Sequence, residues 1–564
     1  MRVLGIEGTA WAASAAVYDT ETDDVFVESD TYEPDSGGIH PREAAEHMRE
    51  AIPSVIETAL EYAREQRRVD EPAGESTDLD RPTPPIDAVA FSQGPGLGPC
   101  LRIVGTAART LAGSLDVPLV GVNHMVAHLE IGRHAAGFDD PVCLNASGAN
   151  AHLLAYRDGR YRVLGETMDT GVGNAIDKFT RHVGWSHPGG PKVEAAAAEG
   201  AYVELPYVVK GMDFSFSGIM SAAKSAVDEG TPVEDVCYGL QETIFAMLTE
   251  VSERALSLTG TDEFVLGGGV AQNARLRSML ETMCTDRGAR FHVPEARFLR
   301  DNAGMIAVLG ATMYAAGDTV AIEASAVDPN YRPDDVAVSW RDDRDRRNDG
   351  YDDREDDEAN DSHEPMGSAS QTIQGAEAVV SLDPPTVTKR RVEKRYRHPE
   401  LDARLRRERT AMEARLTSEA RRAGVSTPVV RAVDRETATI TFEYVGDHEL
   451  RRALTADRVR TVGEHLATLH GVGVVHGDPT TRNVRIDDDR TYLIDFGLGY
   501  YSDHVEDYAM DLHIFEQSLT GTATDSAALC AAVRDGYRSI GDEAVLRRLD
   551  AIEARGRYQS AVGE

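Results

Sequence analysis

Residues 92–105 read SQGPGLGPCLRIVG, a stretch rich in glycine and proline that leads into an apolar segment typical of a helix. Glycine lets the backbone come close to a ligand, and the N–H groups at the start of a helix can hold an anion. A second stretch of this kind, GGGVAQN at residues 267–273, follows the strand-like EFVL and opens another helix. Each turn alone is ordinary between a strand and a helix, so their meaning depends on the surrounding chain.

Short β-branched runs alternate with helical stretches on both sides of these turns. MRVLGIE, IDAVAFS and EFVLGGG are typical of strands, and PREAAEHMREAIPSVIETALEYAREQ is typical of a helix. The alternation indicates an α/β architecture. With GIEGTA at residues 5–10 as a third glycine turn, the pattern resembles the two-lobed fold of the actin, Hsp70 and sugar-kinase superfamily, whose lobes close over a nucleotide.

The length of 564 residues predicts two or three folded units. Residues 341–370 contain almost nothing that a core would bury, which is the composition of a disordered linker. We therefore expect an α/β domain at residues 1–340, an acidic linker at residues 341–370, and a second domain at residues 371–564 that begins with strands and ends with helices.

The composition is strongly acidic, with 95 Asp and Glu against 59 Lys and Arg. Molar salt screens such self-repulsion, because the Debye length then falls to about 3 Å. We therefore expect the salt-rich cytoplasm of a halophilic archaeon, and the five scattered cysteines without a CxxC pair agree with a reducing compartment. No apolar run approaches the roughly 20 residues of a membrane span, so no membrane partner is expected.

Two histidines, His124 and His128, stand four residues apart in NHMVAH. On a helix they share one face and can hold one metal ion, although two histidines can equally pack beside small residues. A metal site needs a further ligand, and Asp301 in RFLRDNAGMIA stands just before an apolar helix. Two histidines and a carboxylate would form a three-ligand set with an open position.

The motifs NHMVAH, SGAN, GVGNAIDKF, HPGGPKVE, GGGVAQN and RDNAGMIA together resemble the tRNA threonylcarbamoyladenosine transferase family in its archaeal form, over residues 1 to about 335. The resemblance implies that His124, His128 and Asp301 bind one divalent metal ion, with Fe²⁺ favoured and Zn²⁺ possible. Asn145 stands where archaeal relatives commonly have a tyrosine ligand, which leaves Asn145, water or the substrate as the fourth ligand.

The same resemblance implies a reaction and a substrate site. The threonylcarbamoyl group moves from threonylcarbamoyl-AMP to N6 of the adenosine that follows the anticodon, in tRNAs that read codons beginning with A. The implied substrate-binding residues are Asn145, Ala146, Ser147, Gly148, Ala149, Asp177, Gly190, Glu194 and Asn273. Asp177 and Glu194 can accept hydrogen bonds from ribose or adenine, although from the residues alone either carboxylate can instead be a structural cap.

Residues 474–497, VVHGDPTTRNVRIDDDRTYLIDFG, have the order of groups that phosphoryl transfer needs. Asp478 is the candidate catalytic base, and Asn483 and Asp495 are the candidate Mg²⁺ ligands. Upstream, Lys389 ends the strand-like TVTK as the ATP-pairing lysine of kinases does, with Glu413 as its partner and Glu408 as the alternative.

GAEAVV, KRYRHPELD, HGDPTTRN and IDFG resemble the small atypical kinase of the KEOPS complex, related to the RIO kinases, over nearly all of residues 371–564. The resemblance implies a small α+β kinase-like domain that uses ATP and Mg²⁺, and two small KEOPS subunits as partners. Gly375 is what remains of the glycine-rich ATP loop, and no APE follows DFG. We therefore expect ATP hydrolysis or phosphorylation of a bound partner only.

Residues 389–422 reverse the charge of the chain, with 13 basic and 6 acidic residues. The segment is either a solvated helix face or a surface for an anionic partner, ATP or tRNA. Arg404, Arg406 and Arg407 are the candidate tRNA-docking side chains outside the ATP site.

Two other functions compete with the transferase. HMVAH is similar to the HExxH of metalloproteases, but Met125 occupies the position of the general-base glutamate. The alternative is a nucleotide-dependent chaperone or regulatory module fused to a small-molecule phosphotransferase. A two-histidine site disfavours it, because chaperones and sugar kinases of this fold do not need one.

Overall fold

The computed structural model of the chain describes residues 1–32, 40–70, 84–148, 150–157, 159–341, 371–375, 377–488, 490–520, 522–523 and 526–557. The chain divides into two compact units, Met1–Asp357 and Glu358–Glu564. Residues 342–370 of the expected linker and Ala149 lie outside the described residues. Arg341, expected as the first linker residue, instead belongs to the first unit, because its guanidinium bonds to Glu130 and Asp140.

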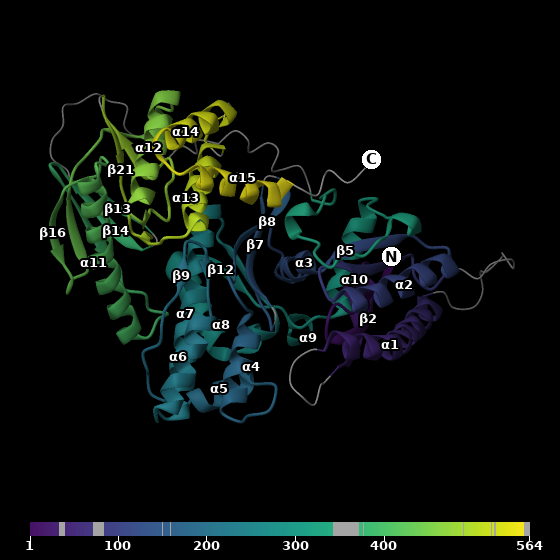
Figure 1. The fold of residues 1–564 in the computed structure, drawn as a ribbon. Coiled ribbons are helices and arrows are strands. Elements are labelled where there is room, and N and C mark those ends of the chain that lie inside the picture. Colours follow the sequence, from purple (N-terminus) through teal and green to yellow (C-terminus); the bar gives the residue numbers. More distant parts are fainter. Residues whose placement is uncertain are drawn as a thin grey trace. The chain divides into compact units, whose positions relative to one another are not determined.

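The first unit contains two five-stranded sheets with the same topology (Figure 1). In each sheet, the first three strands along the chain pair antiparallel in sequence. The fourth strand then pairs in parallel with the first, and the fifth pairs in parallel with the fourth. The first sheet has the order β3-β2-β1-β4-β5, with β1 (Arg2–Glu7), β2 (Ala12–Asp19), β3 (Asp24–Thr31), β4 (Ala88–Gly94) and β5 (Leu119–Asn123). The second has the order β8-β7-β6-β11-β12, with β6 (Val142–Ala146), β7 (Ala151–Arg157), β8 (Arg160–Glu166), β11 (Glu263–Gly267) and β12 (Arg290–His292). This repetition agrees with the two-lobed α/β expectation.

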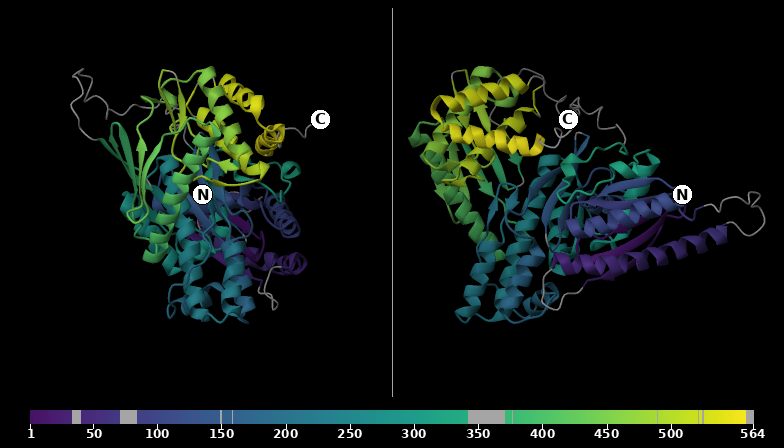
Figure 2. Two further views of the ribbon diagram at one scale, coloured as in Figure 1. Left: turned by 60° about the vertical axis from the view of Figure 1, so that its left-hand side comes forward. Right: turned by 45° about the vertical axis from the view of Figure 1, so that its right-hand side comes forward.

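Helices cover these sheets. They are α1 (Pro41–Asp70), α2 (Gly98–Leu115), α3 (His124–Ala136), α4 (Val172–His182), α5 (Gly190–Ala197), α6 (Ser217–Asp228), α7 (Val233–Thr259), α8 (Ala274–Arg287), α9 (Ala296–Leu299) and α10 (Ala303–Ala315), with a small hairpin of β9 (Val209–Lys210) and β10 (Asp213–Phe214). Figure 2 shows α1 and α2 running along one face of the first sheet.

Alternation along β1 explains how the first sheet is buried on both faces. Leu4 and Ile6 pack in one apolar cluster with residues of α1 and α2, whereas Val3 packs in another with residues of α3 and α10. Gly5 shares the face of Val3, and a Cβ there would lie 2.7 Å from the main-chain nitrogen of Ala307, so α10 packs directly on the strand. The cluster around α3 and α10 also contains residues of β6, β7 and β11, so these two helices join the sheets.

Two of the three glycine turns expected from the sequence connect strands to helices, and the third, at residues 5–10, joins β1 to β2. Residues 92–105 lead from β4 into α2, and Gly94 has a φ of 155° where a Cβ would collide with the carbonyl oxygen of Asp328. Residues 267–273 lead from β11 through a 3-10 turn into α8. Asn123 and Asn273 cap α3 and α8 with their side-chain oxygens, which fixes where these helices begin.

The second unit begins with an antiparallel sheet of order β13-β14-β15-β17-β16, and its second part is mainly helical. The sheet strands are β13 (Gln371–Gln374), β14 (Ala378–Asp383), β15 (Thr386–Arg391), β16 (Val430–Asp434) and β17 (Thr439–Glu443). The helices are α11 (Pro399–Ala423), α12 (Ala456–Gly471), α13 (Val505–Thr520), α14 (Ser526–Ile540) and α15 (Glu543–Arg557). Short strands β18 (His448–Glu449), β19 (Val474–Val475), β20 (Val484–Ile486), β21 (Thr491–Leu493) and β22 (Tyr500–Tyr501) frame the loops between them.

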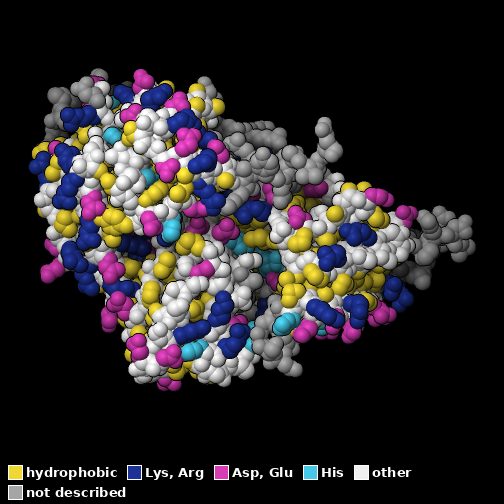
Figure 3. Space-filling model, viewed as in Figure 1, with side chains coloured by type: hydrophobic (Ala, Val, Ile, Leu, Met, Phe, Trp, Pro, Cys, Tyr) yellow, Lys and Arg dark blue, Asp and Glu magenta, His cyan; other side chains and the backbone are white. Residues whose placement is uncertain are grey.

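Charged side chains are spread over the surface. On the face drawn in Figure 3, Asp and Glu lie among Lys and Arg, as expected for a response to solvent rather than to one partner. Within the part of the chain that the structure describes, none of the helices combines the length and apolarity needed to cross a bilayer.

Candidate functional site

The two histidines of NHMVAH lie at the start of α3, as the spacing predicts. Asn123 accepts hydrogen bonds from the main-chain nitrogens of Met125 and Val126 at 3.0 and 3.1 Å, so the helix begins at His124. His128 follows one turn later and the two rings stand 4.9 Å apart. Both side chains therefore leave the helix on one face.

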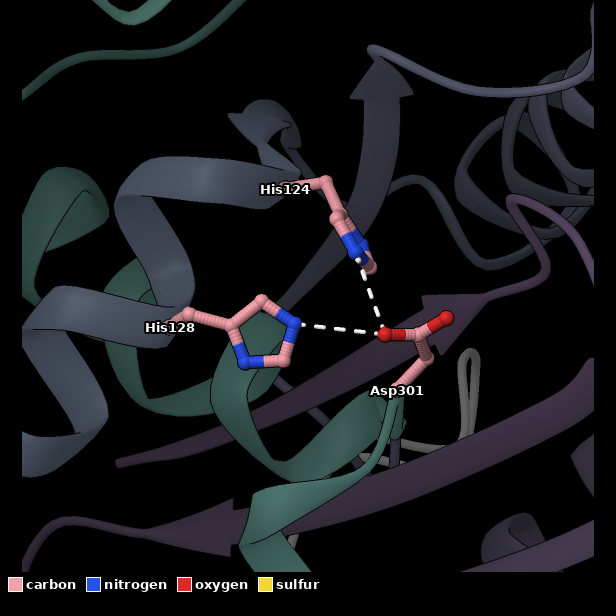
Figure 4. Close-up of side chains that lie close together, drawn as sticks. All are labelled: His124, His128 and Asp301. Atoms are coloured by element: carbon pink, nitrogen blue, oxygen red, sulfur yellow. Dashed lines mark hydrogen bonds and ion pairs between the residues drawn. The ribbon is translucent and has the colours of Figure 1, made fainter. Parts of the chain in front are cut away.

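Asp301 completes the cluster from the short connection between α9 and α10. Its Oδ1 lies 3.3 Å from Nε2 of His124 and 3.2 Å from Nε2 of His128 (Figure 4). Three potential ligand atoms of these residues lie within 4.8 Å of one another. The structure thus brings together the three residues that the sequence singled out, from segments far apart in the chain.

Two further residues, which sequence reasoning missed, contact the cluster: Glu7 at the end of β1 and Trp11 in the turn before β2. Glu7 is completely buried, and its Oε2 lies 3.1 Å from Nδ1 of His124. Thr9 donates to the other carboxylate oxygen from its main-chain nitrogen at 2.7 Å and its hydroxyl at 2.6 Å. Trp11 donates its indole N–H to Oδ2 of Asp301 at 3.1 Å. The only sequence signal was an acidic residue inside an otherwise apolar strand.

These contacts shift the proton affinities of the cluster. Burial opposes a charge on His124, but the carboxylates of Glu7 and Asp301 outweigh it and raise the pKa of His124 to about 10. Burial lowers the pKa of His128, which stays neutral. Burial also opposes the charge on Asp301, yet the neighbouring histidines hold the pKa of that carboxyl below its usual range. Without a metal ion, His124 is therefore a charged imidazolium whose Nδ1–H faces Glu7 and whose Nε2–H faces Asp301.

This arrangement fits a divalent metal ion. Two imidazole nitrogens and one carboxylate oxygen are a donor set used by zinc and non-haem iron. A metal-ligating histidine usually has its second ring nitrogen bonded to an acceptor, and Glu7 supplies that acceptor for His124.

Asn145 and the turn after it lie at the end of β6. Asn145 is 3% exposed, and its Oδ1 has no hydrogen-bond partner among the described residues. The carbonyl oxygens of Ser147 and Gly148 accept bonds from Gly173 and Asn174 at 3.2 and 2.9 Å, which attaches this turn to the start of α4. Ala146 is buried next to Asn145 on β6, so among the described residues of the substrate segment Ser147 and Gly148 are the two that lie in the turn.

His152 also approaches the cluster, although nothing in the sequence singled it out. It is the direct neighbour of Asn145 on β7, and its ring is 2% exposed. Burial is the largest influence on it and lowers the pKa of His152 to about 3, so the ring is neutral. In a sequence, a histidine within an apolar strand cannot be distinguished from an ordinary core residue. The sequence alone therefore does not indicate that His152 lies near the cluster.

The remaining substrate candidates are linked to one another. Asp177 on α4 accepts from the main-chain nitrogen of Gly189 at 2.8 Å, just before Gly190 begins α5. Glu194 on α5 accepts from the main-chain nitrogen of Ala274 at 2.8 Å, so it caps α8. Asn273 donates to the side chain of Gln241 at 3.1 Å.

Gly190 and Asn273 line one pocket, with ≈ 240 Å³ of empty space that includes a part open to solvent. The other lining residues are Ile176, Val193, Leu240, Gln241, Ile244 and Phe245. The pocket is therefore mainly apolar, with two side-chain amides at one side, a composition suited to a flat aromatic group such as a base.

In the second unit, the candidate ATP residues converge. Nζ of Lys389 lies 2.8 Å from Oε1 of Glu413 and 2.6 Å from Oδ1 of Asp495. Glu408, the alternative partner, is exposed. Gly375 lies in the turn between β13 and β14, where its nitrogen donates to the carbonyl of Ala378 at 2.9 Å.

Asp478 and Asn483 share one loop, where Nδ2 of Asn483 donates to Oδ2 of Asp478 at 2.8 Å. A residue missed in the sequence supports this loop: buried Asp511 of α13 accepts from the main-chain nitrogens of His476 and Gly477 at 2.6 and 2.8 Å. The loop is thus held by a buried carboxylate of a neighbouring helix.

The basic segment forms the end of β15 and most of α11. Arg406 donates to Asp402 at 2.6 Å and is only partly exposed, so it does not project freely. Arg407 is exposed and Arg404 is partly exposed. Of the three proposed tRNA-docking arginines, Arg406 therefore has a structural partner that the sequence did not indicate.

Comparison with known proteins supplies the context. The sequence model of tRNA N6-adenosine threonylcarbamoyltransferase (TsaD) matches residues 22–308. A protein of Halobacterium salinarum, named as a probable bifunctional tRNA threonylcarbamoyladenosine biosynthesis protein, is 66% identical over 562 residues and covers 99% of both chains. Relatives of the same name from Natronomonas pharaonis and Methanospirillum hungatei are 67% and 50% identical, over 99% of this chain and 100% and 99% of their own.

Among solved structures, YeaZ from Pseudomonas aeruginosa covers 59% of this chain and 99% of its own, with 11% identity and a TM-score of 0.26, a likeness too low to support an argument.

Proposed function

Because the chain belongs to the tRNA N6-adenosine threonylcarbamoyltransferase family, and within it resembles haloarchaeal bifunctional proteins over its full length, we propose that His124, His128 and Asp301 hold the divalent metal ion of its transferase reaction. The function is threonylcarbamoyladenosine modification of tRNA. The observation that supports this site is the convergence of three ligand atoms with Glu7 behind one of them.

The reaction needs activation of an acyl group, because the exocyclic amine of adenosine is a poor nucleophile. A bound ion supplies Lewis acidity and orients the threonylcarbamoyl group. The chain's own residues position that ion: Glu7 fixes which ring nitrogen of His124 faces Asp301, and Trp11 restrains the second oxygen of Asp301. Fe²⁺ and Zn²⁺ both suit the donor set.

We place the adenylate of threonylcarbamoyl-AMP along the path from the β6–β7 turn to the pocket of Gly190 and Asn273. The carbonyl oxygens of Ser147 and Gly148 accept from Gly173 and Asn174 at the start of α4, so this turn and this helix together would form one wall of the path. The adenine would then lie against the apolar residues at this pocket, beside the Asn273 and Gln241 amides, which are hydrogen-bonded to each other. Asp177 and Glu194 would shape this path indirectly, because their carboxylates accept main-chain hydrogen bonds that hold the α4–α5 and α5–α8 connections.

For the second unit we propose a small kinase-like domain that binds ATP and Mg²⁺. The Lys389–Glu413 ion pair and the approach of Lys389 to Asp495 are the features that support this assignment. Asp478 is the candidate base. Asn483, whose amide is hydrogen-bonded to Asp478, is a candidate Mg²⁺ ligand. Exposed arginines of α11, such as Arg407, and two small KEOPS subunits are the proposed aids to tRNA binding.

The test is transfer by the purified full chain, supplied with threonylcarbamoyl-AMP, unmodified tRNA and any companion subunits it needs. Nucleoside mass spectrometry measures the modified adenosine, and elemental analysis measures bound metal. His124→Ala, His128→Ala and Asp301→Asn should each lose both. His134→Ala is the matched control, because His134 lies on the same helix but pairs with Asp23 at 2.8 Å on the surface. A wild-type protein without stoichiometric metal, or active cluster variants, would contradict the assignment.

A further inference from the structure

A row of three residues crosses the second sheet directly under α3. Asn145 of β6 is paired in register with Gly267 of β11 on one side and with His152 of β7 on the other. Residues paired in this way point to the same face of a sheet. A Cβ on Gly267 would lie 3.8 Å from the carbonyl oxygen of His128, so this is the face on which α3 packs. Asn145 and His152 therefore lie under the helix that carries the candidate metal ligands.

The row is polar where its neighbour is apolar. The next row on the same face consists of Cys143 of β6, Val265 of β11 and Leu154 of β7, each two positions away from its counterpart in the first row. All three side chains are completely buried in the core. Burial by itself thus favours apolar side chains on this face. The change to an amide and an imidazole occurs beside His128.

Four polar atoms in this place lack a hydrogen bond. Within the described residues, neither ring nitrogen of His152, nor Oδ1 of Asn145, nor Nδ1 of His128 has a partner, and all three side chains are nearly completely buried. Buried polar groups are almost always satisfied, and a neutral imidazole offers one donor and one acceptor. A small polar molecule between the three side chains would satisfy them.

The unsatisfied nitrogen of His128 has a specific significance. Its Nε2 faces Asp301, whereas Nδ1 lies on the other side of the ring, away from the candidate metal position. Histidine ligands are normally oriented by a bond from the second ring N–H to an acceptor. Glu7 provides that bond to His124, but His128 has no protein acceptor within the described chain.

We propose that His152 and Asn145 are positioning residues of the metal centre, which hold one ordered water that accepts the Nδ1–H of His128 and keeps its Nε2 directed to the ion. The water would donate to Oδ1 of Asn145 and to a ring nitrogen of His152, which gives it the three partners that buried waters typically have. No direct hydrogen bond satisfies these atoms, and a bridging water would supply the partners that they lack. This inference rests on the proposed metal centre.

The experiment is Co²⁺ titration of the metal-free full chain, with affinity and the visible absorption spectrum as readouts. His152→Leu should weaken Co²⁺ binding by about 10–100-fold and change the spectrum, because His128 loses its orientation. His152→Gln retains a donor and an acceptor and should restore most of the affinity. His292→Leu is the matched control: His292 lies on β12 of the same sheet and also has an unsatisfied ring nitrogen, but β12 is the edge strand beyond β11 and β6.

Two outcomes would overturn the inference. In the first, the His152→Leu protein matches His292→Leu in Co²⁺ affinity and in spectrum. In the second, His152→Gln loses as much Co²⁺ affinity as His152→Leu, which would indicate that the shape of the His152 side chain matters rather than its polarity. If His152→Leu does not fold, a high-resolution crystal structure of the wild type decides. A water bonded to Nδ1 of His128 and Oδ1 of Asn145 supports the proposal, and a dry gap refutes it. Absence of Co²⁺ binding in the wild type would instead refute the metal centre itself.

Discussion

Replacing Glu7 by glutamine should impair metal binding through the tautomer of His124. In the wild type, one carboxylate oxygen of Glu7 accepts two bonds from Thr9 and the other lies 3.1 Å from Nδ1 of His124. The main-chain N–H of Thr9 can only donate, so the oxygen of the glutamine amide must stay on that side. Its NH₂ group then faces His124.

An NH₂ group requires Nδ1 of His124 to act as an acceptor, and a neutral imidazole with a free Nδ1 carries its proton on Nε2. Nε2 is the nitrogen that lies 3.3 Å from Asp301 and is the candidate ligand atom. In the wild type the ion replaces the Nε2 proton while Nδ1–H stays bonded to Glu7, whereas in the variant the new bond at Nδ1 must also break so that the remaining proton can move to Nδ1. A hydrogen bond to a charged group contributes about 1.5–3 kcal/mol, which corresponds to a loss of roughly 10–150-fold in metal affinity.

Competition titration of the metal-free protein against a chromophoric chelator, in molar KCl, measures this loss. Glu130→Gln is the matched control. Glu130 is a buried carboxylate on α3, the helix of His124, but it accepts hydrogen bonds from Arg133 and Tyr161 at 2.7 and 2.8 Å. Thermal unfolding of both variants monitors the shared cost of removing a buried charge. If Glu7→Gln is folded and binds metal as tightly as Glu130→Gln, the argument from the tautomer is wrong.

Three further predictions concern other parts of the molecule. The pKa of His124 is raised to about 10, so its charge stabilises the metal-free protein fully below the unfolded pKa near 6.5, and this stabilisation is lost as pH rises through 10. Because metal competes with a proton on His124, metal affinity should rise about tenfold per pH unit from pH 7 towards pH 10. A pH-independent metal affinity in calorimetry would contradict this. Asp495→Asn should abolish ATP turnover by the second unit while Co²⁺ binding by the first is unchanged; a parallel loss of both would show that the two sites are coupled. Asn273→Ala removes the α8 cap and should reduce the free energy of unfolding by about 1 kcal/mol in denaturant titrations, whereas Asn273→Ser should recover part of it; equal stabilities of the two variants would argue against the cap.

The sequence alone determined the features that depend on local spacing. The separation of four placed His124 and His128 on one face of a helix, because a helix repeats every 3.6 residues. The strand-turn-helix order of residues 92–105 and 267–273 was likewise recoverable, since glycine and a capping residue act within a few positions. The acidic composition also indicated the likeness to haloarchaeal proteins, such as the relatives from Halobacterium salinarum and Natronomonas pharaonis.

Only the tertiary structure decided the contacts between distant segments. Glu7 reaches His124 across 117 positions because β1 lies in the sheet on which α3 and α10 pack, and no periodicity connects a strand with a helix so far along the chain. Strand register placed His152 beside Asn145, helix packing chose Glu413 rather than Glu408 for Lys389, and the start of α8 turned Glu194 into a cap. Local energies select secondary structure, but which side chains meet is set by how sheets and helices bury their apolar faces together.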